Sequence, residues 1–248
     1  MSPPLLQAKD LRIAFYGVQA ADGVNLEIRE GEFLAIIGPN GSGKTTFLNL
    51  CTGYLRPSSG EVYLDGEPIT AMAPRAIARR GIARAFQIPQ LFLDQTVLEN
   101  LMIAVAARRG VWTAMQGLGA HGRRAEAMEL LSLVGLDREA AQRAGALPEG
   151  RRKLLDIAIA LALEPRLVLL DEPTSGVSTI ERFELMETLM NALRRAKTTA
   201  LFVEHDMDVV QRYADRVLVW DSGSVLAAGP PAEIFSNPEV LRKVVGAP

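Results

Sequence analysis

Cysteine and histidine are scarce in this chain of 248 residues. The one cysteine, Cys51, cannot form an internal disulfide, and the two histidines, His121 and His205, belong to no cluster with zinc-ligand spacing. A fold that depends on disulfides or on structural zinc is therefore excluded. A reducing compartment is expected.

The chain also lacks long apolar runs and an excess of charge of one sign. No stretch reaches the roughly 18 uninterrupted apolar residues that a membrane-spanning helix needs. The N-terminus has no basic region followed by an apolar core. The 27 basic and 29 acidic side chains give a net charge of −2, which argues against binding nucleic acid or an anionic membrane through bulk charge. We therefore expect a soluble chain whose membrane role, if it has one, comes through a partner.

Strands are predicted from the pattern of apolar side chains. Period-two alternation over residues 11–15 and 24–28 favours two strands, with the bend between them at residues 21–23. Unbroken apolar runs at residues 33–37 and 167–170 are typical of strands that are buried on both faces. Further strands are expected at residues 61–64, 199–203 and 216–221.

Helical patterns fill the segments between these strands. Strands that alternate with helices imply right-handed crossovers and a mainly parallel sheet. Residues 95–163 are almost wholly helical in pattern, with a glycine-containing break over 110–122, so we expect an inserted helical subdomain there. The other helices are expected at residues 44–53, 71–84 and 180–196, and from residue 207 onward.

A glycine-rich segment, GPNGSGKT at residues 38–45, lies between a predicted strand and a predicted helix. It matches the phosphate-binding loop, in which glycines let successive backbone N–H groups approach phosphate oxygens and the helix N-terminus adds its dipole. Lys44 would contact the β- and γ-phosphates, and the Thr45 hydroxyl can ligate Mg²⁺. A turn that only caps a helix is the alternative, but the flanking strand and helix favour nucleotide binding. The predicted nucleotide-binding residues of this segment are Gly38, Pro39, Asn40, Gly41, Ser42, Gly43, Lys44, Thr45 and Thr46.

Two adjacent carboxylates, Asp171 and Glu172, follow the buried strand at residues 167–170. A carboxylate at the carboxyl end of such a strand is expected beside the phosphate loop. Asp171 can hold Mg²⁺, and Glu172 is placed to polarise an attacking water as a general base. The alternative is that the pair only caps the next helix. Its combination with the phosphate loop favours a catalytic role.

With these two segments in place, the whole chain resembles the ATP-binding subunit of an ABC transporter. The resemblance implies ATP and Mg²⁺ as ligands, and an α/β P-loop ABC ATPase core with an antiparallel β subdomain and an inserted helical subdomain. It implies one ABC ATPase domain over residues 1–248. The core and β subdomains would cover about 1–94 and 165–248, and the helical subdomain about 95–164.

The resemblance also assigns roles to residues outside the two segments. Gln87, after Phe86, is similar to the family's Q-loop glutamine, which senses the metal and water, so that Gln87 joins Thr45 and Asp171 as a metal residue. His205 resembles the switch histidine at the γ-phosphate and, with Glu172 and Gln87, completes the catalytic set. Phe15, or less favourably Tyr16, falls where a ring stacks on adenine. Residues 175–178 correspond to the D-loop, which crosses to a second subunit.

The segment LPEGR at residues 147–151 is expected to be the signature that completes the nucleotide site of a partner subunit, through Pro148, Glu149 and Gly150. Glu149 departs from the family's glycine or tyrosine. A carboxylate that faces a γ-phosphate at 4 Å would be repelled by about 4 kcal/mol at an effective dielectric constant near 20. Arg151 and Arg152 are expected to offset this repulsion. We hypothesise that the site completed by this chain is weaker than the site on its own loop.

The segments at 80–87, 91–92 and 96–101 resemble those of branched-chain amino acid, urea and amide uptake ATPases. The resemblance implies an energy-coupling subunit at the cytoplasmic face of the inner membrane. Its partners would be transmembrane permease subunits, a second ABC ATPase subunit that is identical or different, and an extracytoplasmic solute-binding protein, without nucleic acid. Residues 88–99 are the candidate permease contact. The alternatives are a soluble ABC ATPase that acts on nucleic acid or ribosomes, and an ATP-binding regulator without turnover.

Overall fold

The computed structural model describes residues 3–109 and 121–245, so most of the glycine-containing break predicted at 110–122 lies outside the described residues. The chain forms two compact units. The first unit comprises Met1–Ala78, Leu169–Glu172 and Thr199–Pro248, and the second comprises Arg79–Val168 and Pro173–Thr198. The subdomain boundaries given above stay a prediction.

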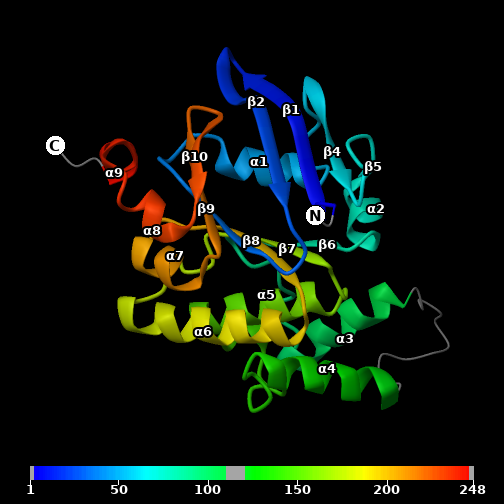
Figure 1. Ribbon diagram of the computed structural model, residues 1–248. Coiled ribbons are helices and arrows are strands. Elements are labelled where there is room, and N and C mark those ends of the chain that lie inside the picture. Colours follow the sequence, from blue (N-terminus) through cyan, green and yellow to red (C-terminus); the bar gives the residue numbers. More distant parts are fainter. Residues whose placement is uncertain (1–2, 110–120, 246–248) are drawn as a thin grey trace. The chain divides into compact units, whose positions relative to one another are not determined.

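An antiparallel sheet in the order β2-β1-β4-β5 forms one part of the first unit (Figure 1). Buried and exposed side chains alternate along β1, as expected when one face of a sheet is covered. The turn between β1 and β2 lies at Tyr16–Gly17, with φ of 49° and 85°. The bend predicted at residues 21–23 is therefore wrong. The strands are β1 (Leu6–Phe15), β2 (Val18–Ile28), β4 (Ser59–Leu64) and β5 (Glu67–Pro68).

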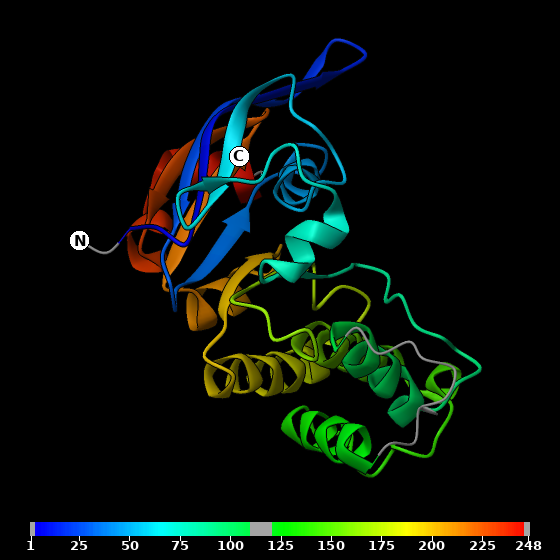
Figure 2. The ribbon, with the colours of Figure 1, turned by 90° about the vertical axis from the view of Figure 1, so that its right-hand side faces the viewer.

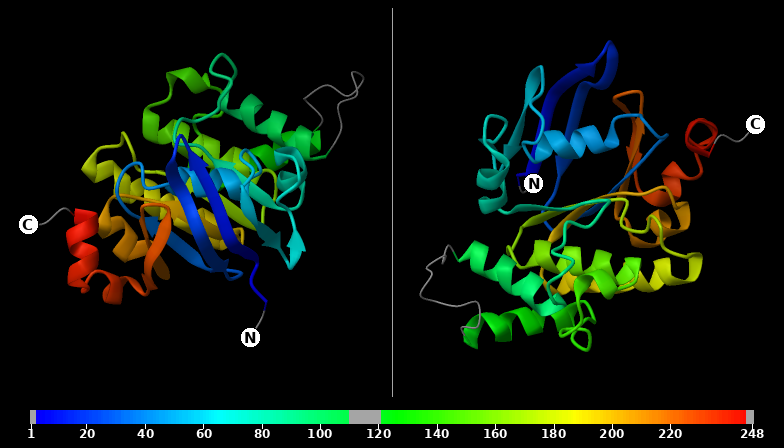
Figure 3. Two further views of the ribbon diagram at one scale, coloured as in Figure 1. Left: turned by 90° about the horizontal axis from the view of Figure 1, so that it is seen from above. Right: turned by 180° about the vertical axis from the view of Figure 1, so that it is seen from behind.

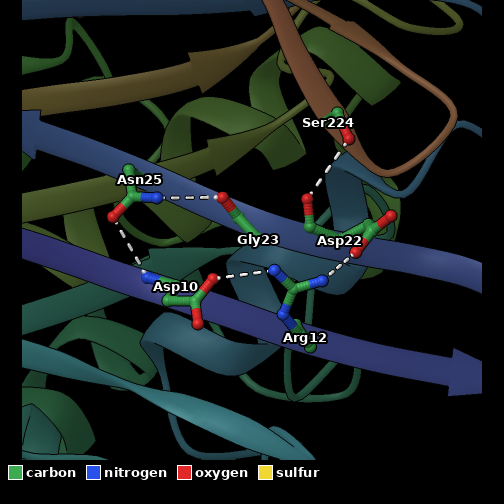
Figure 4. Close-up of polar contacts among 6 residues, drawn as sticks. All are labelled: Asp10, Arg12, Asp22, Gly23, Asn25 and Ser224. Atoms are coloured by element: carbon green, nitrogen blue, oxygen red, sulfur yellow. Dashed lines mark hydrogen bonds and ion pairs between the residues drawn. The ribbon is translucent and has the colours of Figure 1, made fainter.

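Residues 21–23 instead lie within β2, where the pairing with β1 shifts register between Leu11 and Ile13. Polar side chains hold this irregularity together (Figure 4). The Arg12 guanidinium donates to Asp10 and Asp22, and the Asn25 side chain accepts from the Asp10 N–H and donates to the Gly23 carbonyl. The aspartate and glycine that suggest a turn thus belong to a bulge inside a long strand.

Strands β10, β9, β3, β8 and β7 are successive neighbours in a second sheet, and all but the first two residues of β7 belong to the first unit. β3 runs parallel to β8 and β9, and β10 pairs antiparallel with β9. Every residue of β3, β7 and β8 is buried, as their unbroken apolar sequences require. The strands are β3 (Phe33–Ile37), β7 (Leu167–Asp171), β8 (Thr199–Val203), β9 (Arg216–Asp221) and β10 (Ser224–Gly229).

Helices cover this unit and position its loops. α1 contacts β2, and Figure 3 shows it beside the amino-terminal strands when the ribbon is seen from behind. α7 begins at an Asp206 cap, whose side chain accepts from the N–H groups of Asp208 and Val209. The helices are α1 (Lys44–Cys51), α2 (Pro74–Arg79, whose last residue belongs to the second unit), α7 (Met207–Tyr213), α8 (Pro231–Ile234) and α9 (Pro238–Val245).

The second unit is a group of packed helices with one short strand (Figure 2). α5 contacts α3, α4 and α6, and α3 begins with a capping box between Thr96 and Glu99. Among the described residues, no helix is both long enough and apolar enough to cross a membrane. The helices are α3 (Val97–Arg108), α4 (His121–Leu133), α5 (Glu149–Leu161) and α6 (Thr179–Arg195), with a 3₁₀ turn at Ala144–Ala146.

The helix predicted over residues 71–84 is wrong in its second half. α2 ends at Arg79, and Ile82–Ala85 form strand β6, which lies next to β7 in the sheet order. Gly81 has a φ of 100°, which stops the helix, and its carbonyl accepts the N–H groups of Arg166 and Leu167. The pairing partner is thus about 85 residues away, which no local pattern shows.

Candidate functional site

The predicted site residues of the first unit gather where three neighbouring strands end. β3 leads into the phosphate loop, β8 leads to His205, and β7, next to β8, ends at Asp171. Since β3 and β8 are parallel, their carboxyl ends lie at the same edge of the sheet. The Glu172 N–H donates to the Val203 carbonyl at 3.1 Å, which joins the segments after β7 and β8.

The phosphate loop has a backbone that only glycine adopts without strain at several positions. Gly38, Gly41 and Gly43 have φ of 155°, 76° and 108°. A Cβ at Gly38 would lie 2.0 Å from the Trp220 carbonyl oxygen, and a Cβ at Gly43 would lie 2.0 Å from the Ala20 carbonyl oxygen. The loop is therefore fitted closely against β9 and β2.

Trp220 also holds the loop through its side chain. Its indole Nε1–H donates to the Ser42 carbonyl at 2.9 Å, and this oxygen also accepts the Gly223 N–H at 2.9 Å. The fully buried indole ring packs against Phe47 of α1, with ring centroids 5.1 Å apart. Trp220 was not predicted as a site residue, because only the tertiary pairing of β9 brings it to the loop.

Lys44 is folded against its own loop and is only 5% exposed. Its ammonium donates to the carbonyls of Gly38 at 2.8 Å and Pro39 at 2.7 Å. Burial lowers the pKa of Lys44, whereas the nearby Glu172 and Asp171 carboxylates oppose that shift. The buried ammonium is suited to bind an anionic ligand, and the two carboxylates beside it are suited to bind a cation that accompanies that ligand.

The side chains of Thr45 and Asp171 meet across the site. The Thr45 hydroxyl donates to Asp171 Oδ1 at 3.3 Å, and Asp171 is 4% exposed. A hydroxyl and a carboxylate oxygen are hard oxygen donors of the kind that Mg²⁺ accepts. This donor set therefore fits the predicted magnesium ion.

Glu172 and His205 form the second polar pair of the site. His205 Nε2 lies 2.9 Å from Glu172 Oε1. Glu172 has a φ of 50°, an uncommon conformation for a residue with a side chain. The His205 N–H is held at 3.2 Å by Oε2 of Glu204, which is 2% exposed. Both members of the pair are thus fixed through their backbones.

A cavity of about 280 Å³ opens on the phosphate loop. Phe15 lines it and is 40% exposed, whereas Tyr16 stands fully in solvent at the hairpin turn and is not among the lining residues. The Ser42 hydroxyl is enclosed in the loop, so any contact of Ser42 with a ligand falls to its backbone. The lining residues are Phe15, Val18, Ala20, Asn40, Gly41, Gly43, Lys44, Thr45, Thr46 and Glu172.

Gln87 belongs to the second unit, where it is exposed on the loop that follows β6. Asp156 of α5 holds this loop: its Oδ2 accepts the Phe86 N–H at 3.1 Å and its Oδ1 accepts the Gln90 N–H at 3.3 Å. Sequence reasoning missed Asp156. The available signal was a carboxylate among buried apolar residues of one helix, between Leu155 and Ile157.

The predicted signature residues Pro148, Glu149 and Gly150 also lie in the second unit, at the start of α5. They line a cavity of about 430 Å³, to which Glu181 and Glu184 of α6 add two more carboxylates. A Cβ at Gly176 would lie 2.8 Å from Glu149 Oε1, so the Glu149 carboxylate faces the predicted D-loop segment.

Arg151 pairs with a carboxylate other than that of Glu149. Its guanidinium donates to the Gly135 carbonyl at 2.7 Å and pairs with Glu139 at 3.2 Å. It is thus engaged with the segment that follows α4.

Comparison with known proteins identifies the family. A sequence profile described as "ABC transporter" matches residues 21–175, which is more than half of the chain. The chain belongs to the ABC transporter family, as an ATP-binding subunit that hydrolyses ATP. It is 37% identical over 253 residues to the high-affinity branched-chain amino acid transport ATP-binding protein LivG of Salmonella typhimurium, with 99% of each chain covered. It is 36% identical over 254 residues to BraF of Pseudomonas aeruginosa, a protein with the same description, again with 99% of each covered.

Solved structures agree with this assignment. The ADP conformation of MJ1267, an ATP-binding cassette of an ABC transporter, matches with a TM-score of 0.85 and 30% identity, covering 99% of this chain and 100% of that chain. The dimeric, post-hydrolysis cassette MJ0796 bound to ADP and phosphate matches with a TM-score of 0.77 and 29% identity, covering 91% and 98%. The predicted fold class and the resemblance to ABC ATPase subunits are thereby confirmed.

The close approach of Gly43 to the Ala20 carbonyl predicts different ATP affinities for two matched variants. Gly43→Ala is expected to lower the affinity for ATP at least about tenfold, because its Cβ would displace the loop from the Ala20 carbonyl. Gly41→Ala also has a positive φ but meets nothing within 4 Å, so a smaller loss is expected. Calorimetric titration with Mg-ATP measures both. Equal losses in the two variants would contradict the tight fit.

The raised pKa of Asp156 predicts that the stability of the fold depends on pH. Burial raises its pKa from 3.8 to about 6, although the Phe86 and Gln90 N–H groups and the Lys153 charge act in the opposite direction. Because the folded state then holds the proton more tightly than the unfolded state, the contribution of Asp156 to stability is present below about pH 4. It is lost as the pH rises through about 6.

The free energy of unfolding of wild type minus that of Asp156→Asn should therefore fall by about 2 kcal/mol between pH 4 and pH 7. Urea denaturation at several pH values measures this difference. A difference that is constant, or that grows as the pH rises, would show that the Asp156 carboxyl has an ordinary or lowered pKa.

Proposed function

We propose that this chain energises the uptake of branched-chain amino acids or related small solutes. LivG and BraF, which are branched-chain amino acid transport ATP-binding proteins with 37% and 36% identity over nearly the whole chain, support this choice of solute. The observation that carries the proposal is the cavity on the phosphate loop, which Lys44 and Glu172 line together. It combines a phosphate-binding cation with a base for hydrolysis.

In the proposed binding mode, the loop residues 38–46 enclose the phosphates of ATP with backbone N–H groups and the Lys44 ammonium. The side chain of Phe15 lies at the same cavity, where its ring supplies a stacking face for adenine. The Lys44 ammonium now donates to two loop carbonyls, and phosphate oxygens would draw it toward the ligand. We expect these residues to provide most of the affinity.

Mg²⁺ is proposed to bind Thr45 and Asp171, whose side-chain oxygens lie 3.3 Å apart. When bound, the ion neutralises charge on the phosphate oxygens. Asp171 has the second task of keeping the Thr45 hydroxyl oriented. Gln87 remains a predicted metal residue.

For hydrolysis, we assign Glu172 as the general base. A water oxygen attacks the γ-phosphorus, the bond from this phosphorus to the ADP oxygen breaks, and Glu172 takes the proton from the water. His205 orients the Glu172 carboxylate if Nε2 carries the ring proton, because Nε2–H then donates to Oε1.

The proposed partners are transmembrane permease subunits, a second ABC ATPase subunit and an extracytoplasmic solute-binding protein. This assembly would place the chain at the cytoplasmic face of the inner membrane. The proposed permease contact includes Ile88, Phe92 and Leu93, which are large apolar side chains with exposed fractions of 74%, 59% and 50%. Apolar side chains that are exposed together favour a protein partner.

Two alternatives remain distinguishable by experiment. A soluble ABC ATPase that acts on nucleic acid or ribosomes would co-purify with RNA or DNA, whereas the proposed subunit would co-purify with membrane proteins. A regulator that binds ATP without turnover would release no phosphate in the presence of Mg²⁺. The Glu172–His205 pair supports turnover.

Glu172→Gln tests the hydrolytic and transport roles together. The amide keeps the size of the side chain but cannot take a proton, so ATP binding should persist while kcat falls by about 10²- to 10⁴-fold. In cells that lack the wild-type chain, wild type should restore uptake of radiolabelled leucine and Glu172→Gln should not. Uptake that is independent of this chain would contradict the transport role, and full phosphate release by Glu172→Gln would contradict the assignment of the base.

Glu149→Gly tests whether the site that this chain completes on a partner is weak. Three carboxylates, those of Glu149, Glu181 and Glu184, line one cavity at the predicted signature, which is unfavourable for a γ-phosphate. Removing Glu149 should raise the ATPase rate of the assembled subunits severalfold. Rates are measured with the chain alone and with its partner ATPase. If the rate rises in neither pairing, the hypothesis is wrong.

A further inference from the structure

α5 carries two charged side chains that are almost fully buried. Lys153 is 3% exposed and Asp156 is 6% exposed, and both belong to the second unit. Residues three apart lie on the same face of a helix. Their neighbours Leu154, Leu155 and Ile157 are buried and apolar. Burial of charge costs free energy unless the charge is paired or hydrogen-bonded, so the contacts of these two residues indicate what they do.

Asp156 spans the loop that carries Gln87. Its two carboxylate oxygens accept from different amides, Phe86 N–H at 3.1 Å and Gln90 N–H at 3.3 Å. These amides lie on either side of Gln87 in the sequence. One carboxylate therefore fixes both ends of the segment from which the Gln87 side chain projects.

Lys153 reaches a second loop. Its ammonium donates to the Ser175 hydroxyl at 3.4 Å, in the segment between β7 and α6. It also acts electrostatically on Asp156. One turn of α5 thus contacts both the loop after β6 and the segment after β7.

We propose that Asp156 is a positioning residue that holds Gln87 in the place needed for ATP turnover, and that Lys153 ties this loop to the Ser175 segment through α5. The proposal rests on the predicted role of Gln87 in turnover. Neither residue contacts the reacting atoms in this account; each acts through the loop that it holds. The burial of a carboxylate among apolar side chains supports this view, because an apolar residue would fill the same helix face without the cost of a buried charge.

A double-mutant cycle provides the test. Asp156→Asn removes the charge and leaves an amide whose NH₂ group would face one of the two loop N–H donors. We expect kcat of the full chain, assembled with its partner subunits, to fall about ten- to hundredfold. The Kd for Mg-ATP should change by less than about threefold. In a Gln87→Ala background the same substitution should lower kcat little further, because Asp156 acts through Gln87. Additive losses in the double variant would overturn the proposal.

Amide hydrogen exchange gives a readout that a general loss of stability would not imitate. In Asp156→Asn, exchange should speed up at least about tenfold in the peptide that covers residues 84–92, while strand β8 keeps its protection. Asp137→Asn, which replaces an exposed carboxylate of the same unit, is the matched control and should behave as wild type.

Lys153→Met, which keeps the apolar stem, should lower kcat and speed up amide exchange in the Ser175 segment. Wild-type kcat and exchange in Lys153→Met would overturn the second half of the proposal.

Two outcomes separate this proposal from the predicted role of Gln87. Full activity in Gln87→Ala would count against that role, whereas unchanged exchange at residues 84–92 in Asp156→Asn would count against positioning by Asp156. If Asp156→Asn does not fold, amide exchange in the wild-type chain tests the proposal. Its Phe86 and Gln90 amides should be protected from exchange, and rapid exchange of both would overturn the proposal.

Discussion

The structure depends on how closely the backbone of the phosphate loop approaches the strands around it. At Gly38 and Gly43, any Cβ would lie 2.0 Å from a carbonyl oxygen, of Trp220 in one case and Ala20 in the other. The loop is therefore shaped from outside by β9 and β2, and the Trp220 indole holds the Ser42 carbonyl. A binding loop that its surroundings hold in shape loses less freedom when it binds a ligand, and such preorganisation favours both binding and catalysis.

Charge is arranged around this loop in two polar pairs. Thr45 with Asp171 offers hard oxygen donors, and Glu172 with His205 is the pair that we propose as the base and the group that orients it. Lys44 lies close enough to both carboxylates for their charge to act on its pKa. Membership of the ABC transporter family gives these pairs a common task, because an ATPase must hold the metal and activate water at the same phosphate.

The strands β3, β8 and β9 could be predicted almost to the residue, because unbroken apolar runs and β-branched side chains are properties of the local sequence. The phosphate loop could also be predicted, since its glycines and lysine follow a fixed spacing. Wrong predictions arose where contacts within or between paired strands decide the structure. Residues 21–23 become a bulge through Arg12 and Asn25, and Ile82–Ala85 become a strand through pairing near Arg166. Trp220 and Asp156 escaped prediction because their partners are 178 and 70 residues away.

In the proposed binding mode, affinity comes from the polyphosphate and not from the base alone. Calorimetric titration of the purified chain with adenosine, AMP, ADP and ATP, each with magnesium, tests this most directly. ADP and ATP should bind far more tightly than AMP, with adenosine weakest, because only the longer chains reach the loop amides and Lys44. Equal affinities across the four ligands, or no heat with ATP, would contradict it.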